Sequence, residues 1–304
     1  MSDFVMAAIQ AAPIHFDREG STAKACRLIA EAGAQGATIA AFGEAWLPGY
    51  PVFAHIAQGP RRWELGSAYL ANAVQIPGPA TERLCAAAAK AGIDVVIGVA
   101  ELDERTRGTV YATLLFIGRD GSLIGKHRKL KPSFHERTVW GEGTGTSIRV
   151  HERPYGRISG LNCWEHMMML PGYALASQGT QIHVAAWPGR EPENAPPAPT
   201  TTWPRQVLLS RAFACQAGAY VICVAGINRK SDHPEEYRDL LPFEQDGGSC
   251  IIDPRGEVIV GPVSGREEIL IAPGSFDLLR TVKAVIDIGG HYSRPDVFDF
   301  KILR

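Results

Sequence analysis

The sequence predicts an α/β protein in which sheets and helices form separate layers. Apolar stretches of strand length alternate with amphipathic stretches of helix length along most of the chain. Many of the strand-like stretches are apolar at almost every position, which is typical of strands buried on both faces. Hairpin patterns occur beside strand-helix-strand patterns, so the sheets must be mixed. Two sheets packed face to face with helices outside satisfy these observations, although the pattern also permits a single mixed sheet.

The first half of the chain sets this alternation. Its apolar strands are interrupted by alanine-rich helices that begin near a serine or threonine cap, and its last two strands flank a short turn around Asp120. The expected elements are a strand over residues 5–11, a helix over 21–34, a strand over 37–42, a helix over 81–91 capped by Thr81, an apolar strand over 94–100, and a hairpin of 111–117 with 122–126.

The second half repeats the pattern and ends in a second hairpin. The expected elements are a strand over residues 157–161, a helix over 164–176, a strand over 182–187, a helix over 203–217, a strand over 220–227, and a hairpin of 249–252 with 257–260. Residues 189–204 are rich in proline, alanine and threonine and predict a long surface loop. A loop-like tail begins at about residue 289.

Composition narrows the possible classes of protein. With 304 residues, 45% of them hydrophobic, the chain can bury a large core, and we expect one domain over residues 1–304. The formal net charge is −1, from 31 basic and 32 acidic residues spread along the chain, which argues against nucleic acid or an anionic membrane as a partner. No stretch approaches the ~20 apolar residues of a membrane span, and the N-terminus lacks a secretory signal, so a cytoplasmic protein is expected.

Cys163 is a candidate nucleophile. It stands in the run NCWEH, where a strand-like segment gives way to a helix-like one. A thiol at the positive end of a helix is expected to have a lowered pKa and more thiolate character. The six cysteines are widely spaced and include no Cys-x-x-Cys pair, so free thiols are expected. A single cysteine is weak evidence, because most unpaired cysteines are small buried hydrophobes.

Two further polar residues interrupt apolar runs at predicted strand ends. Glu44 follows the strand over residues 37–42, and Lys129 lies in the run HRKLKP. A carboxylate can take the proton from a thiol, and an ammonium group can stabilise the negative charge that forms on the substrate. Taken alone, Glu44 could equally be a cap or an ion-pair partner, and Lys129 could belong to a solvated basic face.

Several ordered motifs make the chain resemble the nitrilase branch of the carbon-nitrogen hydrolase superfamily. The three that carry the candidate residues are residues 42–51 (FGEAWLPGYP), 127–132 (HRKLKP) and 162–168 (NCWEHMM). Three more agree with it, namely residues 136–143 (ERTVWGEG), 181–188 (QIHVAAWP) and 290–297 (GHYSRPDV). The resemblance covers nearly the whole chain, from about residue 5 to residue 297.

The resemblance implies a four-layer α-β-β-α sandwich and an active site. Within it, Cys163 is expected to be the nucleophile, Glu44 the base and Lys129 the electrostatic stabiliser. A fourth polar residue is expected at Glu136, with Glu142 of the same motif as its rival. Trp164 is expected to bind substrate or to anchor the segment after Cys163 in the core, and its backbone amide is the natural oxyanion donor.

The implied activity is hydrolysis of an organic nitrile with two waters to a carboxylic acid and ammonia, through a thioimidate and a thioester on Cys163. An amidase, an N-carbamoyl amino acid hydrolase or a cyanide hydrolase of the same superfamily stays open, since Cys163, Glu44 and Lys129 alone do not separate these reactions. A non-catalytic binding protein is the rival from another class. No cofactor and no metal are expected, because the nine histidines form no ligand motif. The resemblance also implies a homo-oligomer.

Overall fold

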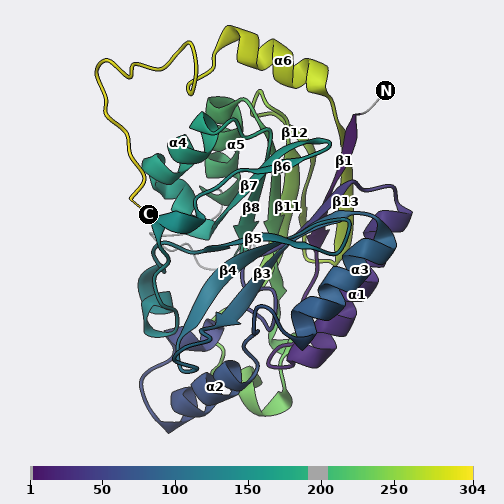
Figure 1. Cartoon of the computed structure of the whole chain (residues 1–304). Coiled ribbons are helices and arrows are strands. Elements are labelled where there is room, and N and C mark those ends of the chain that lie inside the picture. The colour runs from purple at the N-terminus through teal and green to yellow at the C-terminus, as the bar shows by residue number, and fades with distance from the viewer. Residues whose placement is uncertain (1–2, 191–204, 304) are drawn as a thin grey trace.

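Two mixed sheets packed face to face, with helices on both outer sides, make up the fold in a computed structural model that describes residues 3–190 and 205–303 (Figure 1). The first sheet has the order β13-β1-β2-β3-β4-β5, and β1, β2 and β3 within it are parallel. Its strands are β1 (Phe4–Gln10), β2 (Ile39–Phe42), β3 (Asp94–Leu102), β4 (Val110–Ile117), β5 (Leu123–Arg128) and β13 (Glu268–Gly274). Because β13 pairs with β1, the first and the last strand of the chain lie side by side in this sheet.

The second sheet has the order β10-β11-β9-β8-β7-β6, with β12 paired to β11. Strands β7, β8 and β9 are parallel at its centre. Its strands are β6 (His151–Arg153), β7 (Gly156–Asn162), β8 (Ile182–Trp187), β9 (Tyr220–Ala225), β10 (Ile227–Asn228), β11 (Gln245–Ile252) and β12 (Val258–Ser264).

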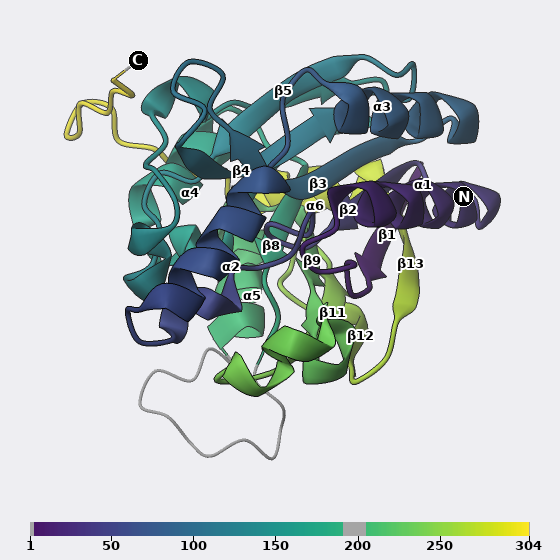
Figure 2. The same cartoon turned by 90° about the horizontal axis from the view of Figure 1, so that it is seen from below.

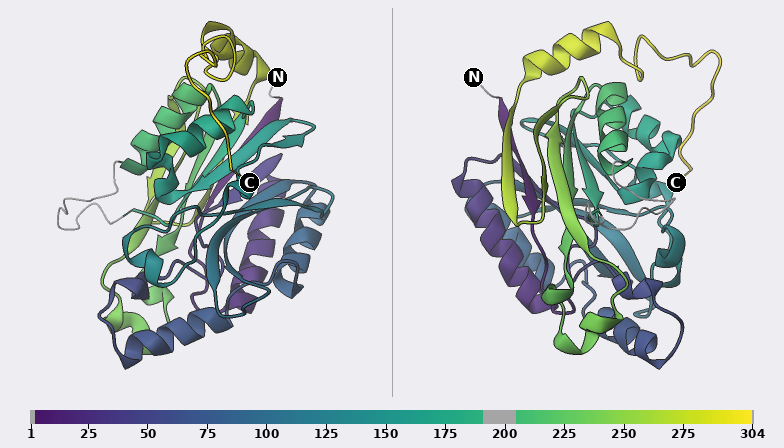
Figure 3. Two further views of the ribbon diagram at one scale, coloured as in Figure 1. Left: turned by 60° about the vertical axis from the view of Figure 1, so that its left-hand side comes forward. Right: turned by 180° about the vertical axis from the view of Figure 1, so that it is seen from behind.

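Helices complete the outer layers. Helices α1 (Arg18–Ala34) and α3 (Pro79–Ala91) cover the first sheet, and α4 (Met169–Ser177) and α5 (Arg205–Ala217) cover the second (Figures 1 and 3). Helix α2 (Pro60–Ala71) lies across one end of the sandwich, and α6 (Phe276–Val285) lies at the other (Figures 1 and 2). The short 3-10 helices are η1 (Val52–His55), η2 (Phe134–Thr138), η3 (Gly145–Ser147), η4 (Cys163–Met167), η5 (Lys230–Asp232) and η6 (Glu235–Leu240). None of the helices described is long and apolar enough to cross a membrane.

Strand periodicity explains the layers. In β1, Ala7 and Ile9 face the core beneath α1 and α3, whereas Met6 and Ala8 face the core between the two sheets. Successive side chains of a strand point to opposite faces, so a strand that is apolar throughout must lie between two apolar layers. The four-layer sandwich expected from the sequence is therefore confirmed.

The prediction of one continuous helix over residues 164–176 is wrong, because the structure has two shorter helices there. The chain instead forms η4, turns at Met168 in an extended conformation, and starts α4 at Met169. Pro171 is then the third residue of α4, where its missing N–H has no helical partner to lose. A proline in this place favours a new helix start over a continuous helix.

Two helix starts also differ from the sequence prediction. Helix α1 begins earlier than expected, because Asp17 caps it by accepting a bond from the backbone N–H of Gly20 (2.9 Å). Helix α3 begins at Pro79, and Thr81 lies inside its first turn, where its hydroxyl accepts from the N–H of Gly78 (2.9 Å). The sequence prediction also missed α2, α6 and β13. The loop expected over residues 189–204 falls, beyond its first two residues, outside the described residues.

Candidate active site

Cys163 lies directly after β7, at the first position of η4, and is buried. Its backbone has a positive φ of 49°, which is unfavourable for a residue with a side chain and costs on the order of 1–2 kcal/mol. Burial raises the pKa of the Cys163 thiol, and the backbone N–H of Trp164, the next residue, works against this effect. A strained conformation of this kind persists only where surrounding contacts stabilise it, so neighbouring residues must hold this turn in place.

Glu44 follows β2 and reaches the same end of the sandwich from the first sheet. Its backbone N–H donates to the carbonyl of Trp187 at the end of β8 (3.1 Å), so the two sheets are joined here. A Cβ on Gly43 would lie 2.8 Å from that same carbonyl oxygen, so a side chain there would push the sheets apart. The Glu44 carboxylate is buried, and its Oε2 has no partner among the described residues.

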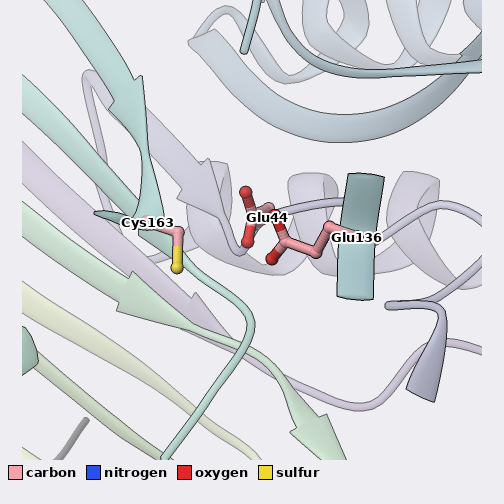
Figure 4. Close-up of side chains that lie close together, drawn as sticks. All are labelled: Glu44, Glu136 and Cys163. Carbon is pink, nitrogen blue, oxygen red and sulfur yellow. The ribbon is translucent and has the colours of Figure 1, made fainter. Parts of the chain in front are cut away.

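Lys129 follows β5 and joins the two carboxylates expected from the sequence. Its Nζ donates to Oε1 of Glu44 and to Oε2 of Glu136, both at 2.7 Å, and its side chain is fully buried. Glu44 and Glu136 come from different segments, and their carboxylates face one another beside Cys163 (Figure 4). One oxygen of each carboxylate and the thiol sulfur lie within 4.8 Å of one another. Four residues spread over the sequence thus form one buried cluster.

The structure separates the two candidates for the fourth polar residue. Glu136 is buried in η2, where Oε2 also accepts from the backbone N–H of Ser133 (2.6 Å) and Oε1 from the hydroxyl of Tyr50 (2.8 Å). Glu142 is exposed and pairs with Lys131 at the surface. Glu136 therefore belongs to the cluster, and Glu142 does not.

The thiol of Cys163 is less acidic than its position in the sequence suggested. Burial raises the pKa of Cys163 well above its ordinary value, and the neighbouring Glu44 raises it further, although Lys129 opposes them. The expectation of a lowered thiol pKa was wrong because η4 is a single short turn and the carboxylates lie closer than any helix dipole. The thiol is therefore protonated at neutral pH and needs a base.

Glu44 is suited to be that base. Burial raises the pKa of Glu44 to about 8, with Glu136 adding to the effect and Lys129 working against it. Burial alone would lower the pKa of Lys129, but Glu136 and Glu44 outweigh it and keep that pKa well above its ordinary value. Lys129 is therefore a permanent cation, while Glu44 can both take up and release a proton near neutral pH.

The donor set could in principle bind a metal, because two carboxylates and a thiol converge. The Nζ of Lys129 lies between the carboxylates, however, and neutralises the charge that would attract a cation. The residues present therefore favour acid-base chemistry over metal binding.

A cavity of about 130 Å³ opens onto the cluster. Cys163, Glu136 and Trp164 line it, with Trp164 packed edge-on against Phe134 at 5.3 Å between ring centroids. The other lining residues among those described are Tyr50, His55, Ser133, Trp187, Pro188, Gly189, Phe243 and Gln245. Aromatic side chains around a few polar groups are typical of a site for a small organic molecule.

Glu165 is a buried residue of the site that sequence reasoning did not single out. Its carboxylate accepts from the backbone N–H of Leu130 (2.8 Å), from that of Asn162 (2.8 Å), and from Nε2 of His127 (3.0 Å). Leu130 follows Lys129 and Asn162 precedes Cys163, so one carboxylate fixes the spacing of both candidate catalytic residues. Burial alone would raise the pKa of Glu165, but these partners outweigh it and keep it below its ordinary value. The signal available in the sequence was a glutamate two residues after the candidate nucleophile.

Comparison with protein families and individual proteins identifies the class. Residues 6–284 match the family model of carbon-nitrogen hydrolases. The chain is 52% identical over 299 residues to nitrilase 2 from an unknown prokaryotic organism, covering 97% of this chain and 91% of that protein. It is 36% identical over 303 residues to an aliphatic nitrilase of Rhodococcus rhodochrous, covering 97% and 81%.

Solved structures agree in fold. Nit3 of Saccharomyces cerevisiae, a member of branch 10 of the nitrilase superfamily, superposes with a TM-score of 0.75 at 19% identity, covering 95% of this chain and 96% of that chain. An amidase from Nesterenkonia sp. superposes with a TM-score of 0.68 at 17% identity, covering 93% and 95%. The chain belongs to the carbon-nitrogen hydrolase family and is a hydrolase of carbon-nitrogen bonds. Within that family it is a nitrilase-family enzyme.

Proposed function

We propose that this protein is a nitrilase that converts an organic nitrile and two waters into a carboxylic acid and ammonia. The observation that carries the proposal is the buried cluster of Cys163, Glu44, Lys129 and Glu136, of which Cys163 and Glu136 line a cavity with aromatic side chains in its wall. It pairs a protonated nucleophile with a base of raised pKa and a fixed cation. A reaction that adds a thiol to an unsaturated carbon requires these three groups.

In the first half of the reaction, Sγ of Cys163 attacks the nitrile carbon while Glu44 takes its proton. The proton passes to the nitrile nitrogen, which gives a thioimidate. The first water then adds to the thioimidate carbon, and Glu44 moves a proton from this water to the nitrogen. Glu44 then carries the hydroxyl proton of the tetrahedral species to the nitrogen, the C–N bond breaks, ammonia leaves, and a thioester remains on Cys163.

In the second half, a second water attacks the thioester with Glu44 again as the base. The C–S bond breaks, the proton returns to sulfur, and the carboxylic acid leaves. Lys129 and the backbone N–H of Trp164 stabilise the negative charge that develops on nitrogen or oxygen in each step. Glu136 holds Lys129 in place and, by raising the pKa of Glu44, strengthens it as a base. The ring of Trp164 lines the cavity as a substrate contact.

A nitrile is favoured over an amide because the chain is 52% identical to a protein named nitrilase over nearly all of its length. An amidase or an N-carbamoyl amino acid hydrolase would use the same four residues, and a cyanide hydrolase would use them on the smallest nitrile. Substrate pairs that differ only in the reacting group therefore separate these activities.

The test is ammonia release from phenylacetonitrile against phenylacetamide, from an aliphatic nitrile against its amide, and from cyanide. Ammonia from the nitriles alone, lost in Cys163→Ala, is the expected result. Ammonia from the amides alone would assign the protein to the amidases, and ammonia from cyanide alone would make it a cyanide hydrolase. Release that survives in Cys163→Ala would overturn the mechanism.

We also propose that the protein is a homo-oligomer. Exposed apolar side chains gather on η4, α4 and α5, which contact one another, and they include Met169 (85% exposed), Leu170 (67%) and Leu208 (59%). A contiguous apolar surface of this kind is typical of an interface. Light scattering during size-exclusion chromatography should give a mass above 32.9 kDa, and Leu170→Glu should lower it.

A further inference from the structure

A chain of buried hydrogen bonds runs from the backbone of Cys163 into the second sheet. Nδ1 of His166 lies 2.7 Å from the carbonyl oxygen of Cys163, and Nε2 of His166 lies 3.0 Å from Nε2 of His183. Nδ1 of His183 lies 2.8 Å from the hydroxyl of Ser159. His183 and Ser159 are fully buried, and none of these three side chains takes part in the proposed proton transfers.

The hydrogen-bond acceptors determine which ring nitrogen carries the proton in each of the two histidines. A carbonyl oxygen only accepts, so Nδ1 of His166 must carry its proton and, in a neutral ring, Nε2 must be the acceptor. Nε2 of His183 must then donate to it, and the hydroxyl of Ser159 must donate to Nδ1 of His183. Burial lowers the pKa of His166 to about 4 and the pKa of His183 well below its ordinary value, so both rings are neutral at pH 7.

Stacking holds both imidazole rings in these orientations. The ring of His166 stacks on Trp187, with 5.3 Å between centroids and 24° between planes, and the ring of His183 stacks on Phe213, at 3.9 Å and 25°. Rings held on their faces by aromatic side chains and at their edges by hydrogen bonds have little freedom to turn. The position of the His166 N–H is therefore set by side-chain contacts with the second sheet.

The bond to His166 acts on the peptide group that follows Cys163. The carbonyl of Cys163 and the N–H of Trp164 belong to this planar group and point in opposite directions. Anchoring the carbonyl on His166 therefore fixes the direction of the Trp164 N–H on the opposite side of the peptide group. The positive φ of Cys163 makes this arrangement unfavourable without such a contact.

We propose that His166 is a positioning residue that aims the Trp164 N–H at the charge forming on the bound substrate, and that His183 and Ser159 select the tautomer His166 needs. This inference rests on the proposed function for the nature of the substrate. His166 acts through the backbone and has no contact with the reacting atoms. Its effect is expected in kcat, because the N–H is needed only when charge develops.

Asn and Leu at position 166 form a matched pair for the test. An Asn side chain can place its N–H₂ where Nδ1 of histidine lies, and Leu has the same shape without a donor. With a nitrile that the unchanged protein hydrolyses, His166→Leu should lower kcat about tenfold or more with KM changed less than about threefold, a part of the 10²–10³-fold cost of losing such a donor. His166→Asn should recover most of that loss. Equal kcat in all three proteins, or equal losses in both variants, would overturn the proposal.

A second measurement needs no substrate. Long-range ¹H–¹⁵N NMR of the histidine rings, assigned with His166→Asn and His183→Gln, should show neutral His166 protonated on Nδ1 and neutral His183 protonated on Nε2 at pH 7. The reverse tautomers, or a charged ring, would contradict the proposal even if His166→Leu does not fold. If the unchanged protein released no ammonia from any nitrile or amide, the proposed function would fail while this spectrum still decided the role of His166.

Discussion

Two buried glutamates show how the same sandwich uses a carboxylate for stability in one place and for chemistry in another. Glu101 in β3 and Glu44 after β2 are each 2% exposed, and each contacts a lysine. Glu101 also accepts from Nε and Nη2 of Arg128 (3.0 and 2.7 Å) and from the hydroxyl of Thr113 (2.7 Å). Oε2 of Glu44 has no partner among the residues described.

The protonation of the two side chains follows from this difference. Burial alone would raise the pKa of Glu101, but its bonds to Arg128, Lys126 and Thr113 outweigh it and keep the pKa below its ordinary value. Burial raises the pKa of Glu44 to about 8, because Lys129 opposes it while the neighbouring carboxylates of Glu136 and Glu165 add to it. Burial alone therefore does not set the role of a carboxylate; the charges and donors around it matter as well.

The largest effect is expected from Glu44→Gln. Gln has the same shape as Glu but cannot accept the thiol proton, so ammonia release should fall by about 10²–10⁴-fold. The measurement is steady-state ammonia release at matched concentrations of folded protein. Glu101→Gln is the matched control, since it changes an equally buried glutamate, and its loss should be less than about tenfold. Equal losses in both variants would contradict the division of roles.

The stability of Glu44→Gln should change in the opposite direction to its activity. The pKa of Glu44 in the folded protein is about 8, above its ordinary value of 4.5, so between these values the folded state holds more protons than the unfolded state. The free energy of unfolding of the unchanged protein therefore has a contribution that is lost as pH rises toward 8. Glu44→Gln has no carboxyl group at this position, so it does not lose this contribution. Its free energy of unfolding, relative to that of the unchanged protein, should therefore increase by about 1 kcal/mol or more between pH 5 and pH 8, as urea unfolding would show.

Glu101→Leu should lose stability. It leaves Arg128 and Lys126 without their shared carboxylate, and because both cations are partly exposed the expected loss is about 1–3 kcal/mol at pH 7. The pKa of Glu101 is lowered on folding, so its stabilisation is full above the ordinary carboxylate range and is lost as pH falls through the folded value. The gap between the unchanged protein and Glu101→Leu should therefore narrow in acid, as thermal unfolding at pH 7 and pH 4 would show. If the stability difference between the unchanged protein and Glu101→Leu did not change with pH, its cause would be lost packing and not the lost charge.

The sequence predicted much of this division and missed the rest for a physical reason. Alternation of apolar residues and turn motifs was enough for the layers, and the family motifs were enough to single out Glu44, Lys129, Cys163 and Glu136, which the fold brings together. A motif does not contain the number of donors around each side chain, which depends on segments far away in the chain. The shift in the pKa of Cys163 was therefore predicted in the wrong direction, and the contacts of Glu165 were missed.

Other predictions from the sequence stay predictions. The catalytic roles of Glu44, Lys129, Cys163 and Glu136 await mutation. That residues 1–304 form one domain also stays a prediction. A single transition in urea unfolding, followed by both fluorescence and circular dichroism, would check it.

The smallest effect, a shift in pH dependence, is the most specific test of how the cluster works. Protonated Glu44 cannot accept the thiol proton, so kcat/KM should rise with pH through an apparent pKa near 8. The negative charge of Glu136 raises the pKa of Glu44, so in Glu136→Gln the rise of kcat/KM should occur at lower pH. The comparison requires only the residual activity of the variant, because it uses the shape of the profile and not its height.

Glu142→Gln is the matched control, since it removes the exposed glutamate of the same motif. Its kcat/KM should rise at the same pH as that of the unchanged protein, and its kcat should lie within about twofold of the unchanged value. The reason is that an exposed ion pair is worth only about 0–1 kcal/mol. If the rise of kcat/KM moved equally in both variants, general surface charge, and not the buried contact through Lys129, would set the acidity of Glu44. If it moved only in Glu136→Gln, the protein would adjust the pKa of its base with a second buried carboxylate.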